Sequence, residues 1–454
     1  MTRAPLILDG PGPTPDLETP GYREMIERLY ALSRGGTKFG LERIERLLAQ
    51  LGHPERAFPT VHVAGSNGKG STSAFLASIL AEHGRSVALF TSPHLISLTE
   101  RVQFLDGGAP TPIEPEALMR AVARVEATRP GFEDLSFFEA ITAAALWSMR
   151  ERRVDIGVIE AGLGARLDAT RLVDASVAVL TDLSLEHTAI LGDTIADIAR
   201  EEGAVVRPGQ PLIMADGPEP AMKVVDRMAA EVGAPVFRLG RDFHVLSREG
   251  GVTRLRSTAG LEVSARLSLS GPHQSRNAAL ALQAALQVLP DLDAETAQRG
   301  LERARWPGRM EVLALPGRPS VLLDGAQNAH AAAALASGLA ETSRSSGVHF
   351  VFGALRDKDV GLMLAALAPF ARSWTFARPA SVRAKDPEEL AELLPAGLPR
   401  APTGVADTPA AALHAAWDRA ARDGGDVVVC GSLYLVGDVR AVLLQLGATG
   451  LVGS

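Results

Sequence analysis

The string "AGSNGKGST" at residues 64–72 holds the side chains best suited to bind phosphate. A glycine-rich turn lets backbone N–H groups approach an anion, and Lys69 adds a mobile positive charge. The strict phosphate-loop signature has a glycine five positions before the Gly–Lys pair, where this chain has Val63. The string therefore predicts either a nucleotide loop of a less usual type or a glycine turn without a ligand. The candidate phosphate-binding residues are Gly65, Ser66, Asn67, Gly68, Lys69, Gly70, Ser71 and Thr72.

Polar side chains also follow three other apolar runs that resemble buried strands. Glu160 ends "VDIGVIE", Ser92 follows "VALFT", and His187 comes shortly after "VAVLTD". The carboxyl ends of parallel strands meet at one edge of a sheet, and carboxylate and hydroxyl oxygens suit Mg²⁺. These positions predict a site for a hard cation and phosphate, although a structural role for His187 alone is an open alternative.

The second half of the chain carries further polar groups at expected strand or helix ends. His273 and Asn277 begin a helical run after Pro272, where capping is the simpler explanation. Asp324 ends "SVLLD", and Lys358 lies in "LRDKD", for which a solvated charge run is the alternative. Polar side chains thus follow strands in both halves of the chain. This recurrence indicates that the carboxyl edges of the two sheets face one another.

Alternating strand and helix patterns must position these groups. A strand at 59–64, the loop and a helix at 71–83 begin a series that favours a mainly parallel sheet. Residues 234–267 predict a small antiparallel addition, and the Pro- and Gly-rich stretch 305–319 predicts a linker. The expected fold class is α/β. A phosphate-loop domain at 1–308 precedes a smaller Rossmann-like α/β domain at 309–454.

Composition narrows the class of protein. The 454 residues are 46% hydrophobic and carry a net charge of −7, which is typical of a soluble globular protein and implies no general affinity for nucleic acid. One cysteine, Cys430, excludes an intrachain disulfide. No signal peptide or membrane-spanning run is evident, so we expect a cytoplasmic protein that acts as a monomer on small molecules.

Taken together, the ordered strings resemble the folylpolyglutamate synthase/dihydrofolate synthase family, the folate branch of the Mur ligases. The resemblance runs from about Lys38 to Gly437. Its strings are "FGLERIERLLAQLG", "VHVAGSNGKGST", "FTSPHL", "TER", "FFEAITAAALW", "IEAGLGARLDAT", "LEHTAILGDTIADIAREE", "GPHQSRNA", "WPGRME", "DGAQN", "FGALRDKD" and "GSLYLVG".

This resemblance implies an ATP- and Mg²⁺-dependent ligase that adds L-glutamate to dihydropteroate, to reduced folates, or to both, through an acyl phosphate. It assigns catalysis to Lys69, Glu160 and His187, and Mg²⁺ to Ser92, Glu160 and His187. It adds Asn277, Arg309 and Asp324 to the phosphate loop as ATP contacts. It implies that the pterin site is lined by Phe39, Gly40, Ser136, Phe138, Leu167 and Asp168.

The chain departs from the family pattern at several positions. Glu186 replaces an Asp, Gln327 a His and Arg171 an Asn. Glu202 replaces a lysine that the family typically carbamylates to support a second metal ion. Glu202 then either reaches this metal through water or faces solvent.

Two rival functions stay open at this point. A cell-wall Mur ligase is disfavoured by "TSPHL" and by the 63 residues before Ala64, too few for the usual substrate domain. A divergent ATP-binding protein without ligase activity would account for the departures.

Overall fold

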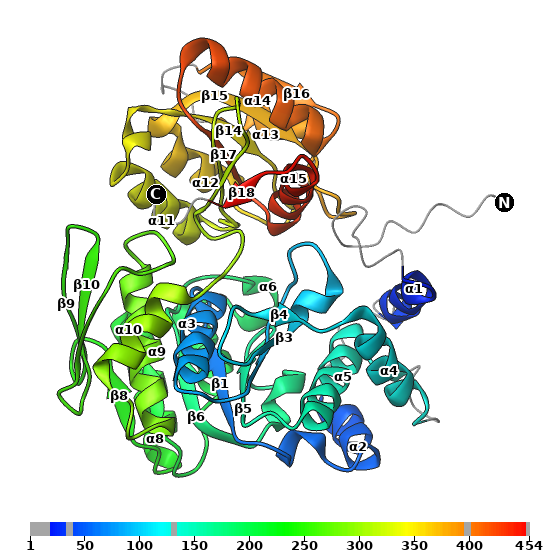
Figure 1. Ribbon diagram of the computed structural model, residues 1–454, viewed down its shortest axis with the longest axis vertical. Coiled ribbons are helices and arrows are strands. Elements are labelled where there is room, and N and C mark those ends of the chain that lie inside the picture. Colours follow the sequence, from blue (N-terminus) through cyan, green and yellow to red (C-terminus); the bar gives the residue numbers. More distant parts are fainter. Residues whose placement is uncertain (1–18, 33–39, 129–133, 395–400, 451–454) are drawn as a thin grey trace.

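The computed structural model describes residues 19–32, 40–128, 134–394 and 401–450 (Figure 1). Two α/β units lie one above the other in this view, with the blue-to-green unit below and the yellow-to-red unit above. Among the described residues, no helix combines the length and apolar character needed to cross a bilayer.

The first unit is built on an eight-stranded sheet with the order β4-β3-β2-β5-β1-β6-β7-β8. All neighbours pair in parallel except β2 with β3 and β3 with β4. Strands β1, β2 and β5 are buried along their whole length, which explains their near-continuous apolar sequences. The strands are β1 (Thr60–Ala64), β2 (Val87–Phe90), β3 (Val102–Leu105), β4 (Thr111–Pro112), β5 (Ile156–Glu160), β6 (Ala175–Leu180), β7 (Leu212–Met214) and β8 (Val236–Arg238).

Helices cover both faces of this sheet. Helix α3 packs with α9 and α10 on one face, and the helices α1, α2, α4 and α5 share a core on the other. These helices are α1 (Tyr22–Leu32), α2 (Glu42–Gln50), α3 (Lys69–Glu82), α4 (Pro115–Glu126), α5 (Phe137–Arg152), α9 (Gln274–Val288) and α10 (Ala294–Arg303). The remaining ones are α6 (Thr188–Leu191), α7 (Ile195–Gly203) and α8 (Glu219–Glu231). The predicted α/β class and mainly parallel sheet are confirmed.

The antiparallel addition is smaller than predicted. Strands β9 (His244–Glu249), β10 (Val252–Arg256) and β11 (Glu262–Ala265) form a three-stranded antiparallel sheet. Strand β8, which the sequence grouped with them, instead pairs in parallel with β7 at the edge of the large sheet. A three-residue strand is too short to show a periodicity that would reveal its partner.

The second unit is a seven-stranded sheet with the order β16-β15-β14-β17-β13-β12-β18. Strand β12 lies within the predicted linker and pairs antiparallel with β13, so that prediction was wrong for these four residues. The strands are β12 (Glu311–Ala314), β13 (Val321–Leu323), β14 (Val348–Phe352), β15 (Ala371–Ala377), β16 (Thr403–Ala406), β17 (Val427–Cys430) and β18 (Thr449–Gly450). The helices are α11 (Ala329–Ala340), α12 (Val360–Leu367), α13 (Pro387–Glu392), α14 (Pro409–Asp423) and α15 (Leu433–Gln445). The domain limits 1–308 and 309–454 stay a prediction.

The two units contact each other through apolar and charged groups. Leu95, in the loop after β2, lies in the apolar core of the second unit and is only 8% exposed. Arg248 of β9 pairs with Glu341 at the end of α11. The edge of the first sheet that carries the phosphate loop therefore faces the second unit.

Close packing of α10 against α3 depends on a glycine. A Cβ atom at Gly300 would lie 2.5 Å from the Cα of Ile79, inside the backbone of α3. Because backbone cannot move aside as a flexible side chain can, α10 would have to shift away.

We predict that Gly300→Ala destabilises the protein by about 1–3 kcal/mol, the usual cost of overpacking. Denaturant unfolding of the wild type and of Gly300→Ala would measure this loss of stability. Gly361→Ala is the matched control, because it is also helical but its Cβ would meet nothing closer than 3.8 Å. Equal stability of Gly300→Ala and the wild type would contradict the proposed tight contact.

Candidate functional site

The loop after β1 leads directly into the amino end of α3. Gly68 takes φ +92° as the residue before the helix, and Gly65 takes φ +127°. Side chains are excluded at both positions, because a Cβ would lie 2.3 Å from Oγ1 of Thr181 at Gly65 and 2.5 Å from Oδ1 of Asn277 at Gly68. No side chain caps α3, so its first N–H groups remain available to an anion.

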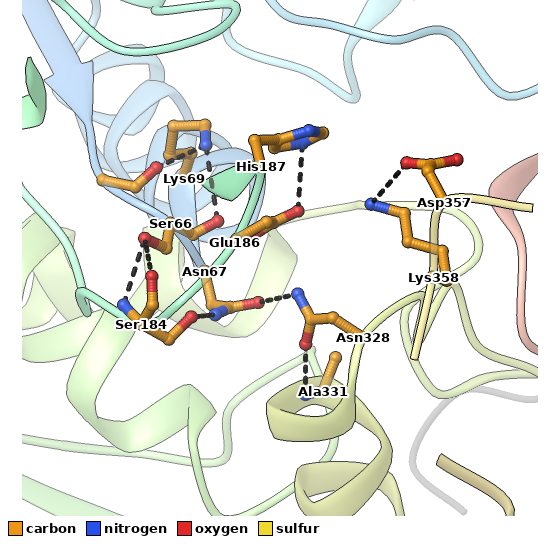
Figure 2. Close-up of polar contacts among 11 residues, drawn as sticks. Ser66, Asn67, Lys69, Ser184, Glu186, His187, Asn328, Ala331, Asp357 and Lys358 are labelled. Carbon is orange, nitrogen blue, oxygen red and sulfur yellow. Dashed lines mark hydrogen bonds and ion pairs between the residues drawn. The ribbon is translucent and has the colours of Figure 1, made fainter. Parts of the chain in front are cut away.

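Lys69 folds back over this loop. Its Nζ donates to the carbonyl oxygen of Gly65 and, at 3.4 Å, to that of Ser66 (Figure 2). The ammonium group therefore lies over the turn rather than in open solvent. A phosphate on the loop would lie within reach of a positive charge that is already positioned.

A cavity of about 180 Å³ opens at this loop, and both units line it. The predicted site residues on its walls are Ser66, Asn67, Gly68, Lys69, Gly70, Ser71, Ser92, Glu160, His187, Asn277, Arg309 and Asp324. Gly65 and Thr72 belong to the same turn and helix but do not line the cavity. The structure thus brings together groups that lie as far apart in the chain as Ser66 and Asp324.

Three carboxylates lie close enough to Lys69 for its charge to act on their pKa values. Glu160 accepts a hydrogen bond from the backbone N–H of Ser92 at 3.1 Å, and burial raises its pKa from 4.5 to about 7 against the opposing charge of Lys69. Burial also raises the pKa of Glu202. Burial favours a higher pKa for Glu186 too, but hydrogen bonding to His187 and the charge of Lys69 outweigh it and lower that pKa.

Glu202 was predicted either to reach a metal or to face solvent, and the solvent-facing alternative is wrong. The residue is 2% exposed, and its Oε2 accepts a hydrogen bond from the N–H of Gly65 at 3.0 Å. Its carboxylate therefore contacts the phosphate loop itself. No sequence signal pointed to this contact, because the two residues are 137 positions apart.

The proposed metal ligands lie on the same cavity. Among the residues that the structure describes, no three His, Cys, Asp or Glu side chains form a group able to hold a metal ion unaided. Ser92 and Glu160 are adjacent, whereas Nε2 of His187 is paired with Glu186 at 3.3 Å. This arrangement fits Mg²⁺, which takes one or two carboxylates and fills its other positions with water and phosphate oxygens.

The second unit contributes Arg309 and Asp324. Asp324 is 7% exposed and accepts hydrogen bonds from Met310 N at 3.0 Å and Ala326 N at 2.9 Å. Burial raises its pKa, which the charge of Arg309 opposes. A buried acid beside an arginine therefore faces the phosphate loop across the cavity.

His273 is a cavity residue whose role the sequence left open between capping and function. It precedes α9, but its side chain makes no capping hydrogen bond. Burial and the charge of Arg309 lower its pKa to about 4, so the ring is neutral near pH 7. The cavity residues that sequence reasoning missed include His330, Leu433 and Gly162.

Of the predicted pterin-lining residues, Phe138 and Asp168 contact Gly162, which lines this cavity. Phe39 lies outside the described residues, and a pterin site at the others stays a prediction. Phe138 and Asp168 both contact Gly162, since a Cβ there would meet the Phe138 ring at 2.7 Å and Oδ2 of Asp168 at 2.9 Å. Ser136 caps α5 by accepting a hydrogen bond from Glu139 N. The carbonyl of Gly40 lies 3.5 Å from a guanidinium nitrogen of Arg43, and Leu167 is half-buried beside Asp168.

A buried polar network connects Asp168 to the strand beneath the loop. Asp168 accepts hydrogen bonds from Gly162 N, Leu163 N and the Thr170 hydroxyl. The Thr170 hydroxyl in turn lies 2.9 Å from Nε2 of His62 on β1. Burial, with the nearby charges of Arg207 and Arg171, lowers the pKa of His62 from 6.5 to about 3.

Each of the two units matches a known protein family domain. Residues 63–285 match the Mur ligase middle domain, and residues 308–433 match the Mur ligase glutamate ligase domain. The chain is 32% identical over 438 residues to dihydrofolate synthase/folylpolyglutamate synthase of Bacillus subtilis, with 92% of this chain and 98% of the relative covered. It is 41% identical over 436 residues to a probable bifunctional folylpolyglutamate synthase/dihydropteroate synthase of Haloferax volcanii. The match covers 92% of this chain but only 50% of that relative's length.

A solved structure shows the same architecture. Mycobacterium tuberculosis folylpolyglutamate synthase complexed with ADP superposes with a TM-score of 0.84 at 30% identity, with 93% of this chain and 99% of that chain covered.

Because His62 is neutral when the protein is folded, we predict that the free energy of unfolding falls in acid. Between its folded pKa of about 3 and its unfolded value of 6.5, the unfolded chain binds a proton that the folded chain does not. The contribution of His62 to stability therefore falls as the pH drops below about 6.5, by at most about 1.4 kcal/mol per pH unit. His62→Gln keeps a polar group near Thr170 but cannot titrate, so its unfolding midpoint should fall less between pH 7.5 and 5.5. Equal losses in both proteins would contradict a buried neutral imidazole.

Proposed function

The chain belongs to the folylpolyglutamate synthase/dihydrofolate synthase family of Mur ligases, and on this premise we propose that it joins L-glutamate to dihydropteroate or a reduced folate at the expense of ATP. The observation that carries the proposal is the cavity in which Lys69, Glu160 and Asp324 from two units meet over one phosphate loop. The relative of known structure was solved with ADP, which supports a nucleotide in this position.

The proposed reaction has two steps. The carboxylate of the pteroate or folate attacks the γ-phosphate of ATP, which gives an acyl phosphate and ADP. The amine of glutamate then attacks the acyl carbon, phosphate leaves, and the nitrogen loses a proton to give the amide. Phosphoryl transfer depends mainly on positioning and charge neutralisation, and Lys69 with the N–H groups of α3 provides both.

Ser92 and Glu160 would hold Mg²⁺, with His187 on the same wall as a further ligand. The ion, when bound, neutralises phosphate charge and fixes the phosphate oxygens. The three carboxylates around Lys69 make this wall of the cavity favourable for a cation. Burial raises the pKa of Glu160 to about 7 although Lys69, Arg309 and Arg101 oppose this shift, so a bound cation would further stabilise the ionised carboxylate.

The folate would lie beside Gly162, with its pterin near Phe138 and Asp168. Both side chains contact Gly162, which lines the cavity, so an acceptor bound there could extend its carboxylate toward Lys69. Asn277, Arg309 and Asp324 are proposed to contact ATP. Action as a cytoplasmic monomer without nucleic acid or membrane partners stays a prediction.

One experiment separates this ligase from an ATP-binding protein without ligase activity. ATP consumption should require both an acceptor and L-glutamate, and the product should contain one more glutamate than the acceptor. Separate assays with dihydropteroate and with a reduced folate would tell which acceptors the protein uses. Hydrolysis of ATP that is independent of glutamate would overturn the proposal.

Lys69→Ala should abolish turnover without unfolding the protein. Loss of one positioned transition-state charge or donor typically costs about 10²–10³-fold in rate. The matched control is Lys223→Ala, which removes an exposed lysine of α8 that pairs with Glu219. Near-normal ligation by Lys69→Ala would show that this loop does not act on the phosphates.

Glu202→Gln tests whether a carboxylate replaces the family's carbamylated lysine. Gln can still accept the hydrogen bond from Gly65 N but lacks the charge, so we predict a higher Mg²⁺ concentration for half-maximal rate. We also predict that wild-type activity does not depend on added bicarbonate, because Glu202 is already a carboxylate. An unchanged Mg²⁺ requirement in Glu202→Gln would show that Glu202 has no role at the metal and only holds the loop.

A further inference from the structure

A side chain of the second unit contacts the phosphate loop directly. Nδ2 of Asn328 donates to Oδ1 of Asn67 at 3.2 Å, across 261 positions of sequence (Figure 2). Both side chains are half-buried. This hydrogen bond joins the loop to the residue that precedes helix α11 of the other unit.

The orientation of both amides is fixed by their other partners. Asn328 precedes α11, and its Oδ1 caps that helix by accepting from Ala331 N at 2.8 Å. Its Nδ2 must therefore face outward, so the facing atom of Asn67 must be the acceptor Oδ1. The Nδ2 of Asn67 then donates to Oγ of Ser184 at 2.7 Å, as observed.

The hydrogen-bonded chain continues into the loop that carries the acidic residues. Ser184 N donates to Oγ of Ser66 at 3.1 Å, and that hydroxyl donates to the Ser184 carbonyl at 3.1 Å. Glu186 and His187 follow Ser184 within three residues and line the cavity, and Figure 2 shows the contact between them. The start of α11 is therefore connected both to the phosphate loop and to this acidic loop.

We propose that Asn328 is a positioning residue that holds the phosphate loop, through Asn67, in the conformation that binds nucleotide. The inference rests on the proposed function, because it takes the loop to be a nucleotide site. Asp324 lies four residues before Asn328 on the same strand-to-helix connection and lines the cavity. The same position of the second unit thus places Asp324 at the cavity and Asn328 against the phosphate loop. By reciprocity, nucleotide binding favours this placement of the second unit.

The decisive variant is Asn328→Ser. Serine is a good helix N-cap, so it can retain the hydrogen bond to Ala331 N, but its side chain is too short to reach Asn67. We expect an unchanged unfolding midpoint without ligand. We also expect about two- to tenfold weaker binding of a non-hydrolysable ATP analogue, AMPPCP with Mg²⁺, measured by calorimetry on the full chain.

Two further variants separate positioning from helix stability. Thr408→Ala removes the cap of α14, in which the threonine side chain accepts from Ala411 N at 3.1 Å, without touching the loop. It should lower the unfolding midpoint and leave AMPPCP affinity unchanged. The double variant Asn67→Ala/Asn328→Ser should bind AMPPCP no more weakly than Asn67→Ala alone, because both changes remove the same contact.

The outcomes are distinct. Wild-type affinity in Asn328→Ser, or losses that multiply in the double variant, would overturn the role of Asn328 and leave the proposed function intact. Failure of the wild-type protein to bind AMPPCP would overturn the proposed function and this inference together.

Discussion

The charge balance around Lys69 is the constraint on which the site depends. One ammonium group faces the carboxylates of Glu160, Glu186 and Glu202, all largely shielded from water. Buried negative charge is costly unless a cation or hydrogen-bond donors compensate it. Backbone N–H groups of Ser92 and Gly65 supply part of this compensation, and Arg309 of the second unit adds positive charge near Glu160. A cation that arrives with a nucleotide would supply the rest.

Both units contact the loops that line the candidate site. The loop after β2 places Ser92 against Glu160, and three residues later Leu95 enters the apolar core of the second unit. The phosphate loop reaches the second unit through Asn67. Movement of one unit relative to the other would therefore shift the groups proposed to bind phosphate and metal, and in this way a closing cleft would be coupled to the proposed chemistry.

Local patterns predicted the fold where elements were long and fully buried. The strand that ends in Glu160 appears as expected, because burial leaves a continuous apolar run there. Helix α3 also appears, because its buried apolar residues Phe75, Leu76, Ile79 and Leu80 recur at helical spacing. Short elements were missed or misassigned. Strand β8 has three residues and β12 has four, and each owes its place to pairing with β7 or β13 rather than to its own pattern.

The sequence by itself determined the family, the phosphate loop and the strand ends that carry Glu160 and Asp324. Such motifs are local, since a glycine turn between strand and helix has few conformations to choose from. Only the tertiary structure decided which distant groups meet. It directed Glu202 to Gly65 N, and Asn328 of one unit to Asn67 of the other. The reason is physical: these contacts depend on the packing of α7 and α11 against the loop, and a side chain's own sequence neighbourhood does not encode where its helix will pack.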